Sequence, residues 1–486
     1  MTAEQYLKQI DDVIAAGPYE ASWESLGGQK TPQWYYEGKF GIFIHWGLYS
    51  VSAFGCEWYS RYMYDPARRE YDHHVAHYGK PDVFGYKDFI PLFRGEHFDA
   101  RRWAEAFRRS GAKFVMPVAE HHDGFAMYET EFNRWKAPAM GICRDYLGEL
   151  KSACEKENLV LCASTHRAEH YFFMNQGRLI QSDVNDPQFE DFYGPAVARD
   201  DLLGEKMSPT TENPVTPGPS DEWMKDWMVR TCELIDRYQP ASLYFDWWIH
   251  NRAFAPYLQK IAAYYYNRAH QWGREVTINF KHDAFPKDVG TFDVERGALT
   301  GISPIPWQTD TAIGRTSWGY TTDNDYKPSR QLICDLIDVV SKNGMLLLNI
   351  GPKADGTFTA EETQVLEEMG TWLKINGEGI YATVPWERFG EGKVNCTDGF
   401  FQDGAEKAFT AKDFRFTQKD GMLYAFQMRP DGEKVVISSL AGRSAASVRL
   451  LGKGEVDFEN GQEGLVIAVP AGNQSDKPIC FKITLS

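Results

Sequence analysis

Two carboxylates stand at the ends of apolar runs that resemble buried strands. Asp246 ends the run "LYFD" and is followed by Trp247 and Trp248, and Glu295 lies in "FDVERG" at 292–297. Glycoside hydrolysis uses a pair of carboxyl groups, about 5–5.5 Å apart in enzymes that retain the anomeric configuration. One group attacks the sugar carbon, and the other gives and takes a proton. A poorly hydrated aromatic pocket would raise the pKa of the proton donor.

Each carboxylate also has a structural interpretation. An Asp or Glu at a strand end can cap the next helix or form a buried ion pair, and Arg296 is adjacent to Glu295. From their spacing alone, the two residues fit either interpretation.

Other chemistries lack the expected spacing. The histidine pairs in "DHH" (72–74) and "EHHD" (120–123) are adjacent residues, which point to opposite sides of a strand and rarely chelate one ion. The patterns HxH, HExxH and CxxC, which would indicate a metal site, and GxSxG, which would indicate a serine esterase, are not found. We therefore expect no metal and no cofactor.

Eight apolar runs with helical segments between several of them could position these residues. Near-continuous apolar strands that alternate with helices are typical of a parallel sheet covered by helices, and about eight of them predict a (β/α)8-like barrel of the α/β class. In that fold the active site lies at the carboxyl ends of the strands. Polar residues follow this rule, since His45, Glu120, His121, His122, His166, Asp246 and Glu295 stand at or just after the ends of runs. The runs are 40–47, 113–124, 159–165, 241–248, 275–280, 291–297, 305–310 and 345–351.

The pattern of apolar and polar residues changes near residue 390. Helices are predicted near the N-terminus and at 99–112, 221–238, 329–344 and 358–383 from their 3.6-residue periodicity. After residue 390, short alternating runs are separated by turn signals such as "PDGE" and "ENGQ". We therefore predict a catalytic unit at 1–389 and an antiparallel β-sandwich at 390–486. The Pro-rich stretch 207–223 is expected to form a loop over the barrel mouth.

Composition narrows the classes of partner. The 486-residue chain carries 52 Lys and Arg against 68 Asp and Glu, a formal net charge of -16. Such a chain repels phosphate backbones, so we expect no nucleic acid and no anionic membrane as partners. Aromatic residues make up 14% of the chain, and their faces suit stacking on sugar rings.

The cysteines and the N-terminus suggest a compartment. Eight cysteines form no CxxC pair, and several lie in apolar runs, so we interpret them as free thiols of a reducing environment. The first 20 residues contain acids at Glu4, Asp11 and Asp12, unlike a signal peptide. No apolar run reaches the ~18 residues of a membrane span. We expect a cytoplasmic, bacterial protein.

Several long stretches together resemble the retaining α-L-fucosidases, the glycoside hydrolase family 29 type. This family carries a (β/α)8-like catalytic domain and a C-terminal β-sandwich. The resemblance runs from about residue 30 to 380 and rests on "WYYEGKFGIFIHWGLYSVSAFGCEWYS" (34–60), "KFVMPVAEHHDGFAMYET" (113–130), "LYFDWW" (243–248), "FDVERG" (292–297), "TSWGY" (316–320) and "GMLLLNIGPKADG" (344–356).

The resemblance implies roles for individual residues. Asp246 matches the nucleophile, and the local pattern around Glu295 matches the acid/base, for which Glu57 is the rival. The sugar would be held by His45, Glu57, Trp58, His121, His122, Tyr244 and Trp318. Fucose is a 6-deoxy sugar, so aromatic walls beside polar groups suit it.

The match to the family pattern is poorer at two places. The acid/base position varies within the family, so its placement on Glu295 rests on the local "FDVERG" pattern. After the third strand the family often shows tyrosines, whereas this chain reads "CASTHRAEHYF", so His166 or His170 would fill that space. Either Lys281 or His282 would supply a basic residue near the sugar.

The expected function is that of an exo-acting retaining α-L-fucosidase. It would act on fucosylated oligosaccharides or glycoconjugates through a fucosyl-aspartate intermediate, with transfucosylation as a possible second outcome. Two alternatives stay open: a lectin-like fucose-binding protein with little catalysis, and a glycosidase for a related sugar. Aromatic residues expected on the surface, Tyr62, Tyr64, Tyr71 and Tyr78, are compatible with a homo-oligomer.

Overall fold

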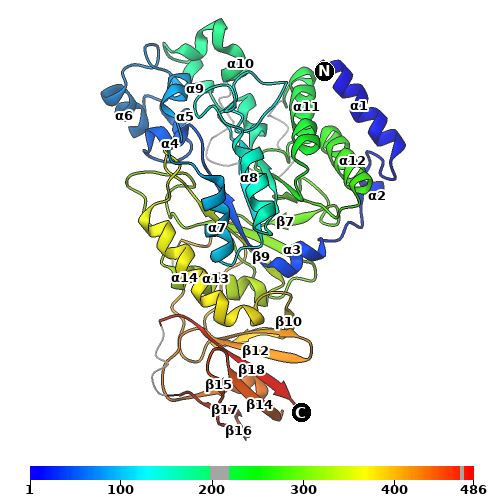
Figure 1. Ribbon diagram of the computed structural model, residues 1–486, viewed down its shortest axis with the longest axis vertical. Helices are drawn as coiled ribbons and strands as arrows, with labels where there is room; N and C mark the ends of the chain where they lie inside the picture. Colours follow the sequence, from blue (N-terminus) through cyan, green and yellow to red (C-terminus); the bar gives the residue numbers. More distant parts are fainter. Residues whose placement is uncertain (198–217, 405, 471–475) are drawn as a thin grey trace.

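The computed structural model of the chain describes residues 1–197, 218–404, 406–470 and 476–486 (Figure 1). Its parallel strands follow the order β1-β9-β8-β7-β6-β5-β4-β2-β3, and a further pairing of β1 with β2 closes the ring. β3 and β4 occupy one strand position, because both pair with β2. The predicted barrel is thereby confirmed. Its strands are β1 (Phe40–Ile44), β2 (Phe114–Glu120), β3 (Val160–Leu161), β4 (Ala163–Thr165), β5 (Ser242–Phe245), β6 (Thr277–Phe280), β7 (Thr291–Asp293), β8 (Trp307–Ala312) and β9 (Gly344–Ile350).

The barrel strands are largely buried because both of their faces are covered. Every residue of β1, β2 and β9 is buried, as expected where helices lie outside and side chains fill the barrel inside. Gly41 is required by this packing, since a Cβ atom there would come within 2.1 Å of the Phe114 ring.

Helices connect most of the strands. The predicted helices are present with close to the expected bounds, and α11 begins where Ser220 accepts a hydrogen bond from the Trp223 backbone N–H. The α-helices are α1 (Ala3–Ala16), α2 (Trp23–Leu26), α3 (Gln33–Gly38), α4 (Tyr49–Ser52), α5 (Tyr59–Tyr62), α6 (Arg69–His77), α7 (Ala100–Arg109), α8 (Tyr146–Lys156), α9 (Asn175–Arg178), α10 (Glu190–Tyr193), α11 (Asp221–Tyr238), α12 (Ala255–Trp272), α13 (Ser329–Ser341) and α14 (Ala360–Asn376).

The barrel is imperfect between β6 and β8, where residues 281–290 and 294–306 contain no helix. A segment from beyond the barrel, residues 398–404, lies against this side. Gly399 forms a β-bridge with Ala298, and the Phe401 N–H donates to the Glu295 carbonyl at 2.9 Å. Asp403 pairs with Arg296 at 3.4 Å. We call residues 398–404 the covering segment.

Antiparallel sheets follow the barrel, as predicted. One has the order β10-β11-β12-β18-β14-β15 and the other the order β13-β17-β16, and a separate apolar core lies among their strands. The expected division at 389 and 390 falls inside β10, whose pairing with β11 favours a division ahead of Val384. The strands are β10 (Val384–Glu391), β11 (Phe414–Lys419), β12 (Met422–Gln427), β13 (Lys434–Ile437), β14 (Ala445–Leu450), β15 (Gly454–Glu455), β16 (Phe458–Gly461), β17 (Gly464–Ala468) and β18 (Ile479–Leu485).

A buried ion cluster joins the sheets to the barrel. Asp338 of α13 accepts from Arg415 Nε of β11 at 2.5 Å and from Lys342 Nζ at 2.9 Å, and Lys407 Nζ lies 3.4 Å away. Burial would raise the pKa of Asp338, but the charges of Lys407 and Arg415 outweigh it and hold the pKa far below its ordinary value. The cluster lies where α13 faces the sheets in Figure 1.

Three further expectations concern the surface. Tyr64 is buried and donates to Asp183 at 2.9 Å, so the expectation of a surface aromatic at this position is wrong. Residues 207–217 of the predicted loop lie outside the described residues. Among the described residues, no helix is both long and apolar enough to cross a bilayer.

Candidate active site

A cavity of about 220 Å³ lies at the carboxyl ends of the barrel strands. The nine residues to which the resemblance assigns catalytic or sugar-binding roles all line it. They lie far apart in the sequence, and the closed barrel brings them together. The nine are His45, Glu57, Trp58, His121, His122, Tyr244, Asp246, Glu295 and Trp318, and the cavity is also lined by Phe43, His166, Trp247, Lys281, Asp310 and Phe401.

Asp246 follows β5 directly, and its carboxylate accepts hydrogen bonds from two side chains. His166 Nδ1 lies 3.0 Å from Oδ2, and Lys281 Nζ lies 2.9 Å from Oδ1. Burial would raise the pKa of this carboxyl, but the charge of Lys281 and the hydrogen bond from His166 outweigh burial and lower the pKa well below its ordinary value. Asp246 is therefore an ionised carboxylate that faces the cavity.

Glu295 lies two residues after β7 and has the opposite character. Its Oε2 accepts hydrogen bonds from Trp247 Nε1 and Lys281 Nζ. Burial raises its pKa to about 7, against the lowering effect of Lys281, and Asp310 and Asp246 raise it further. Two carboxyl groups whose environments move their pKa values apart are suited to different steps of one reaction.

Lys281 connects the two carboxylates. It follows β6, is buried, and contacts both Asp246 and Glu295, with Asp310 at 3.7 Å. Of the two basic residues considered from the sequence, Lys281 lines the cavity. The His282 ring instead packs on Trp247 and Phe400, each at 4.6 Å between ring centroids.

The protonation of His45 follows from its partner. Asn349 Nδ2 donates to the Trp318 carbonyl at 2.7 Å, which turns Asn349 Oδ1 toward His45 Nδ1 at 2.6 Å. His45 Nδ1 therefore carries the proton. Burial and the neighbouring His166 lower the pKa of His45 well below its ordinary value, so the ring is neutral and its Nε2 is a hydrogen-bond acceptor.

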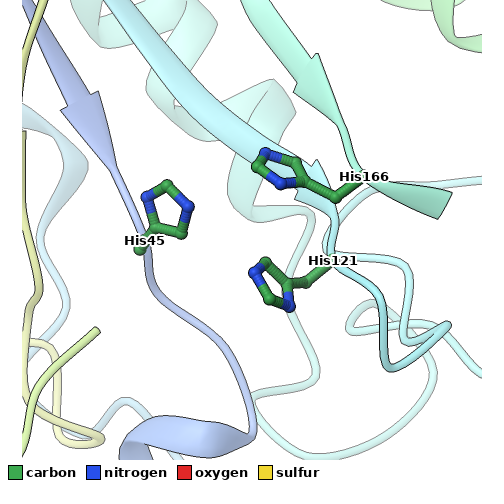
Figure 2. Close-up of side chains that lie close together, drawn as sticks. All are labelled: His45, His121 and His166. Carbon is green, nitrogen blue, oxygen red and sulfur yellow. The ribbon is translucent and has the colours of Figure 1, made fainter. Parts of the chain in front are cut away.

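Figure 2 shows the rings of His45, His121 and His166 around one space, at the ends of β1, β2 and β4. Burial lowers the pKa of His121 well below its ordinary value, and its Nδ1 has no hydrogen-bond partner among the described residues. His166 instead uses both nitrogens, since its Nε2 lies 2.5 Å from Ser164 Oγ. His166 thus occupies the space after the third strand position, while His170 lies behind and bonds the His122 carbonyl at 2.8 Å.

His122 contacts both His166 and Asp246. Its Nδ1 lies 2.9 Å from the His166 carbonyl, and its Nε2 lies 3.5 Å from Asp246 Oδ2. Burial lowers its pKa to about 3, so the ring is neutral. Nδ1 then donates to the carbonyl, and the acceptor nitrogen Nε2 faces the cavity.

Glu57 is fixed as an acceptor on the opposite wall. Its Oε2 accepts from the Trp318 backbone N–H at 2.9 Å and from Ser317 Oγ at 3.1 Å. These bonds hold the carboxylate in place, and the described residues give it no salt bridge.

Aromatic side chains supply the remaining wall. Trp58 packs edge-on against His122 at 5.5 Å, and Trp318 lies 5.3 Å from His45. Trp247 lines the cavity, but Trp248 does not. Trp248 has a positive φ of 74°, which turns it away from the mouth, and its ring packs on Phe172 at 4.7 Å.

Three lining residues, Phe43, Asp310 and Phe401, were not anticipated from the sequence. Asp310 ends the run 305–310 at the carboxyl end of a predicted strand, and this position was a usable signal. Phe401 comes from the covering segment, in a part of the chain with no barrel pattern. Its ring is parallel to that of Trp247, with 6.1 Å between centroids.

A parallel barrel whose mouth combines a carboxylate pair with histidines and aromatic walls defines a glycoside hydrolase. The family model described as "Alpha-L-fucosidase" matches residues 6–378. The chain belongs to the alpha-L-fucosidase family.

Known relatives agree along nearly the whole chain. Human plasma alpha-L-fucosidase is 28% identical over 480 residues, which cover 94% of this chain and 89% of the human protein. Human tissue alpha-L-fucosidase is 27% identical and covers 99% of this chain and 94% of its own length. The crystal structure of Thermotoga maritima alpha-fucosidase in complex with fucose superposes with a TM-score of 0.74 at 27% identity, over 96% of this chain and all of the other.

Proposed function

We propose that the protein is an exo-acting, retaining α-L-fucosidase with Asp246 as nucleophile and Glu295 as acid/base. Family membership supports the fucoside substrate. The cavity, at about 220 Å³, is smaller than the ~300–1,000 Å³ of typical ligand pockets. That size favours a single terminal sugar over an internal residue of a glycan.

The reaction proceeds by two displacements. In the first, an oxygen of Asp246 bonds to the anomeric carbon, the bond to the leaving oxygen breaks, and Glu295 gives that oxygen its proton. In the second, Glu295 takes a proton from water, the water oxygen bonds to the anomeric carbon, and the bond to Asp246 breaks. Two inversions retain the α configuration.

The single observation that carries this proposal is the contact of one ammonium group with both carboxylates. Because Lys281 Nζ bonds both Asp246 and Glu295, their nearest oxygens are no farther apart than the ~5.5 Å that a retaining mechanism needs. An inverting enzyme needs ~6.5–9.5 Å, to leave room for water between the carboxyl groups.

The remaining lining residues would hold the sugar. His45 and His122 offer neutral acceptor nitrogens to its hydroxyl groups, Glu57 offers a fixed carboxylate, and His121 lines the same cavity. Trp58 and Trp318 would lie beside the apolar faces, and Tyr244 would form the floor, since its hydroxyl donates into the barrel to Asp310 at 2.8 Å.

Glu57 remains the rival acid/base. Two observations favour Glu295: burial raises its pKa to about 7, and it shares Lys281 with the nucleophile. Glu57 instead accepts two protein hydrogen bonds on one oxygen, which suits a group that is held in place to bind a sugar hydroxyl.

The test uses an aryl α-L-fucoside with a good leaving group, together with azide. Asp246→Gly is expected to lose ~10³-fold or more of kcat and to regain turnover with azide, releasing β-L-fucosyl azide after one displacement. In Glu295→Gly the fucosyl-Asp246 intermediate still forms, and azide is expected to restore turnover by attacking it. This variant should therefore release α-L-fucosyl azide, after two displacements. The anomer of the product therefore assigns the two roles separately.

Glu57→Gly is the matched comparison. We expect a higher KM and no azide product. An α-azide from Glu57→Gly but not from Glu295→Gly would move the acid/base role to Glu57, and near-wild-type activity of Asp246→Gly would refute the nucleophile.

Two alternatives are separated by the same assay. Tight fucose binding without hydrolysis by the wild type would favour the lectin-like alternative, and equal hydrolysis of aryl galactoside and fucoside would favour a broader glycosidase. Transfucosylation is part of the proposal, because a sugar hydroxyl can replace water in the second step. An added acceptor sugar should then yield a disaccharide.

Three further expectations remain proposals. All eight cysteines are unpaired, which supports a reducing compartment such as the bacterial cytoplasm. The division into a catalytic unit and a sandwich unit is supported by the apolar core that lies among the antiparallel strands. A homo-oligomer would be tested by light scattering after size exclusion.

A further inference from the structure

Three ligand atoms converge on one side of the cavity. His122 Nε2 lies 3.5 Å and His166 Nδ1 lies 3.0 Å from the same oxygen, Asp246 Oδ2. All three atoms lie within 4.8 Å of one another. Bonds of ~2.0–2.1 Å to a tetrahedral zinc ion place its ligand atoms ~3.3 Å apart. The two distances to Oδ2 bracket that value.

The outer contacts of both histidines suit metal binding. Histidines that bind a metal through one nitrogen usually donate the other N–H to a protein oxygen, which fixes the ring and its tautomer. His122 donates Nδ1–H to the His166 carbonyl at 2.9 Å. His166 Nε2 lies 2.5 Å from Ser164 Oγ.

Ser164 allows His166 to release its metal-facing nitrogen. Without an ion, His166 Nδ1–H donates to Asp246, and the Ser164 hydroxyl donates to Nε2. A hydroxyl both donates and accepts. With an ion, the ring proton moves to Nε2 and Ser164 accepts it, so Nδ1 presents its lone pair while the contact with Ser164 is kept.

Charge in the cavity favours an added cation. The lining carboxyl groups, Asp246, Glu295 and Asp310, outnumber the one ammonium group in the described lining, Lys281. A divalent ion offsets this excess of negative charge.

We propose that His122, His166 and Asp246 form a site for a divalent transition-metal ion of the zinc type, and that the ion and the sugar exclude one another. Two imidazoles and one carboxylate form a zinc donor set with one position left open to water. The ion occupies the nucleophile, so it inhibits rather than assists hydrolysis. The mutual exclusion rests on the proposed function, because that function places the fucosyl group against Asp246.

A second group of histidines competes for the same ion. His45, His121 and His166 also bring ligand atoms within 4.8 Å of one another (Figure 2). This group lacks a carboxylate, and His45 and His166 are shared with other contacts. Because both groups need His166, one ion occupies one group at a time, and the charge of Asp246 favours the first.

The experiment begins with the full chain, stripped of metal with a chelator and titrated with Zn²⁺ by calorimetry. Co²⁺ provides an independent optical signal, since tetrahedral Co²⁺ absorbs strongly. We expect one ion per chain at this site, displaced by saturating L-fucose. In the aryl fucoside assay, Zn²⁺ should raise the apparent KM without changing kcat, and EDTA should reverse the effect. Ion binding that saturating fucose leaves unchanged would overturn the proposal.

Matched variants locate the ion. Asp246→Asn removes a ligand of the proposed group only, and His45→Gln removes a ligand of the competing group only. We expect Asp246→Asn to lose more affinity than the ~10–100-fold cost of outer-contact changes, and His45→Gln to bind nearly as wild type. The reverse pattern would place the ion on the three histidines and overturn the proposal.

Two further variants test the outer contact and the surface. Ser164→Ala should weaken Zn²⁺ binding ~10–100-fold, and an unchanged affinity would contradict the role of Ser164. His73 and His77 lie one helical turn apart on α6, with ring centroids 4.2 Å apart, and form an independent surface pair. His77→Gln removes that pair, so the one-ion stoichiometry is measured in this background.

Failure of this inference is distinguishable from failure of the proposed function. Hydrolysis by the metal-free enzyme tests the function without any ion. Zn²⁺ calorimetry tests the metal site without any turnover, and circular dichroism of each variant checks that it is folded. An active enzyme that binds no Zn²⁺ would refute only the metal site.

Discussion

Lys281 shifts the pKa values of the two carboxyl groups that we propose to react. Its charge lowers the pKa of Asp246. It also lowers the pKa of Glu295, but burial raises that pKa by more. A nucleophile must be ionised, whereas a proton donor must hold its proton in the free enzyme. Burial alone would raise the pKa of both, and Lys281 keeps Asp246 ionised where Glu295 is still protonated.

The pH dependence follows from this arrangement. The form of Glu295 that donates a proton is lost as pH rises through its pKa of about 7, so kcat/KM should fall ~10-fold per unit above that pH. Lys281→Met removes a charge that lowers this pKa. We therefore expect a lower maximum and a fall that begins at higher pH, measured as kcat/KM against pH.

Lys281→Arg is the control, because it keeps the positive charge. Its fall should stay near that of the wild type. If Lys281→Met and the wild type lose activity over the same pH range, Glu295 does not set the alkaline limit.

At the scale of elements, the strand positions were readable from the sequence. Strands buried on both faces tend to have near-continuous apolar residues, and each of the eight predicted runs overlaps a strand. Closure of the barrel then brings their polar ends together. This explains why residues as distant as His45 and Trp318 were correctly expected in one cavity.

The direction of residues beyond the strand ends was not readable. His282 and Arg296, each directly after a cavity residue, have positive φ values of 51° and 45°. Non-glycine residues rarely adopt such values, so a His and an Arg at these two positions give no indication of the turn. The choice between Lys281 and His282, and the different orientations of Trp247 and Trp248, therefore depend on tertiary packing.

Phe401 provides a test of the covering segment. Its side chain is 57% exposed, so Phe401→Ala should change the free energy of unfolding by less than ~1 kcal/mol. Because the ring lines the cavity beside Trp247, we expect a clear rise in KM with a smaller change in kcat. Kinetics and thermal unfolding measure the two effects.

Phe401→Tyr keeps the ring and should retain the wild-type KM. An unchanged KM in Phe401→Ala would show that the covering segment contributes backbone contacts but no contact with the sugar.

At the scale of the whole molecule, the ion cluster of Asp338 connects the sheets to the barrel through salt bridges. Asp338 lies among Lys342, Lys407 and Arg415, and its side chain is 1% exposed. A buried pair adds little over an apolar contact, but removing one partner leaves an uncompensated charge, which costs ~3–5 kcal/mol.

Asp338→Asn should therefore destabilise the protein by ~3–5 kcal/mol, measured by denaturant unfolding. Asp12→Asn, which breaks the exposed pair with Lys8, should change stability by less than ~1 kcal/mol. The folded-state pKa of Asp338 is lowered, so its contribution is present above the unfolded-state pKa of ~3.9 and is lost as pH falls. The difference between wild type and Asp338→Asn should shrink in acid, and a constant difference would contradict this account.

The covering segment also bears on the order of events during synthesis. A ribosome adds residues from the N-terminus, and domains generally fold as units as they emerge. All eight barrel strands precede residue 351, yet Phe401 and the backbone contact to Glu295 are added some fifty residues later. A nascent chain can close its barrel while one side of the mouth is still open. We expect stalled chains that end near residue 390 to be folded but unable to hold the sugar, so that binding competence arrives with the last part of the chain.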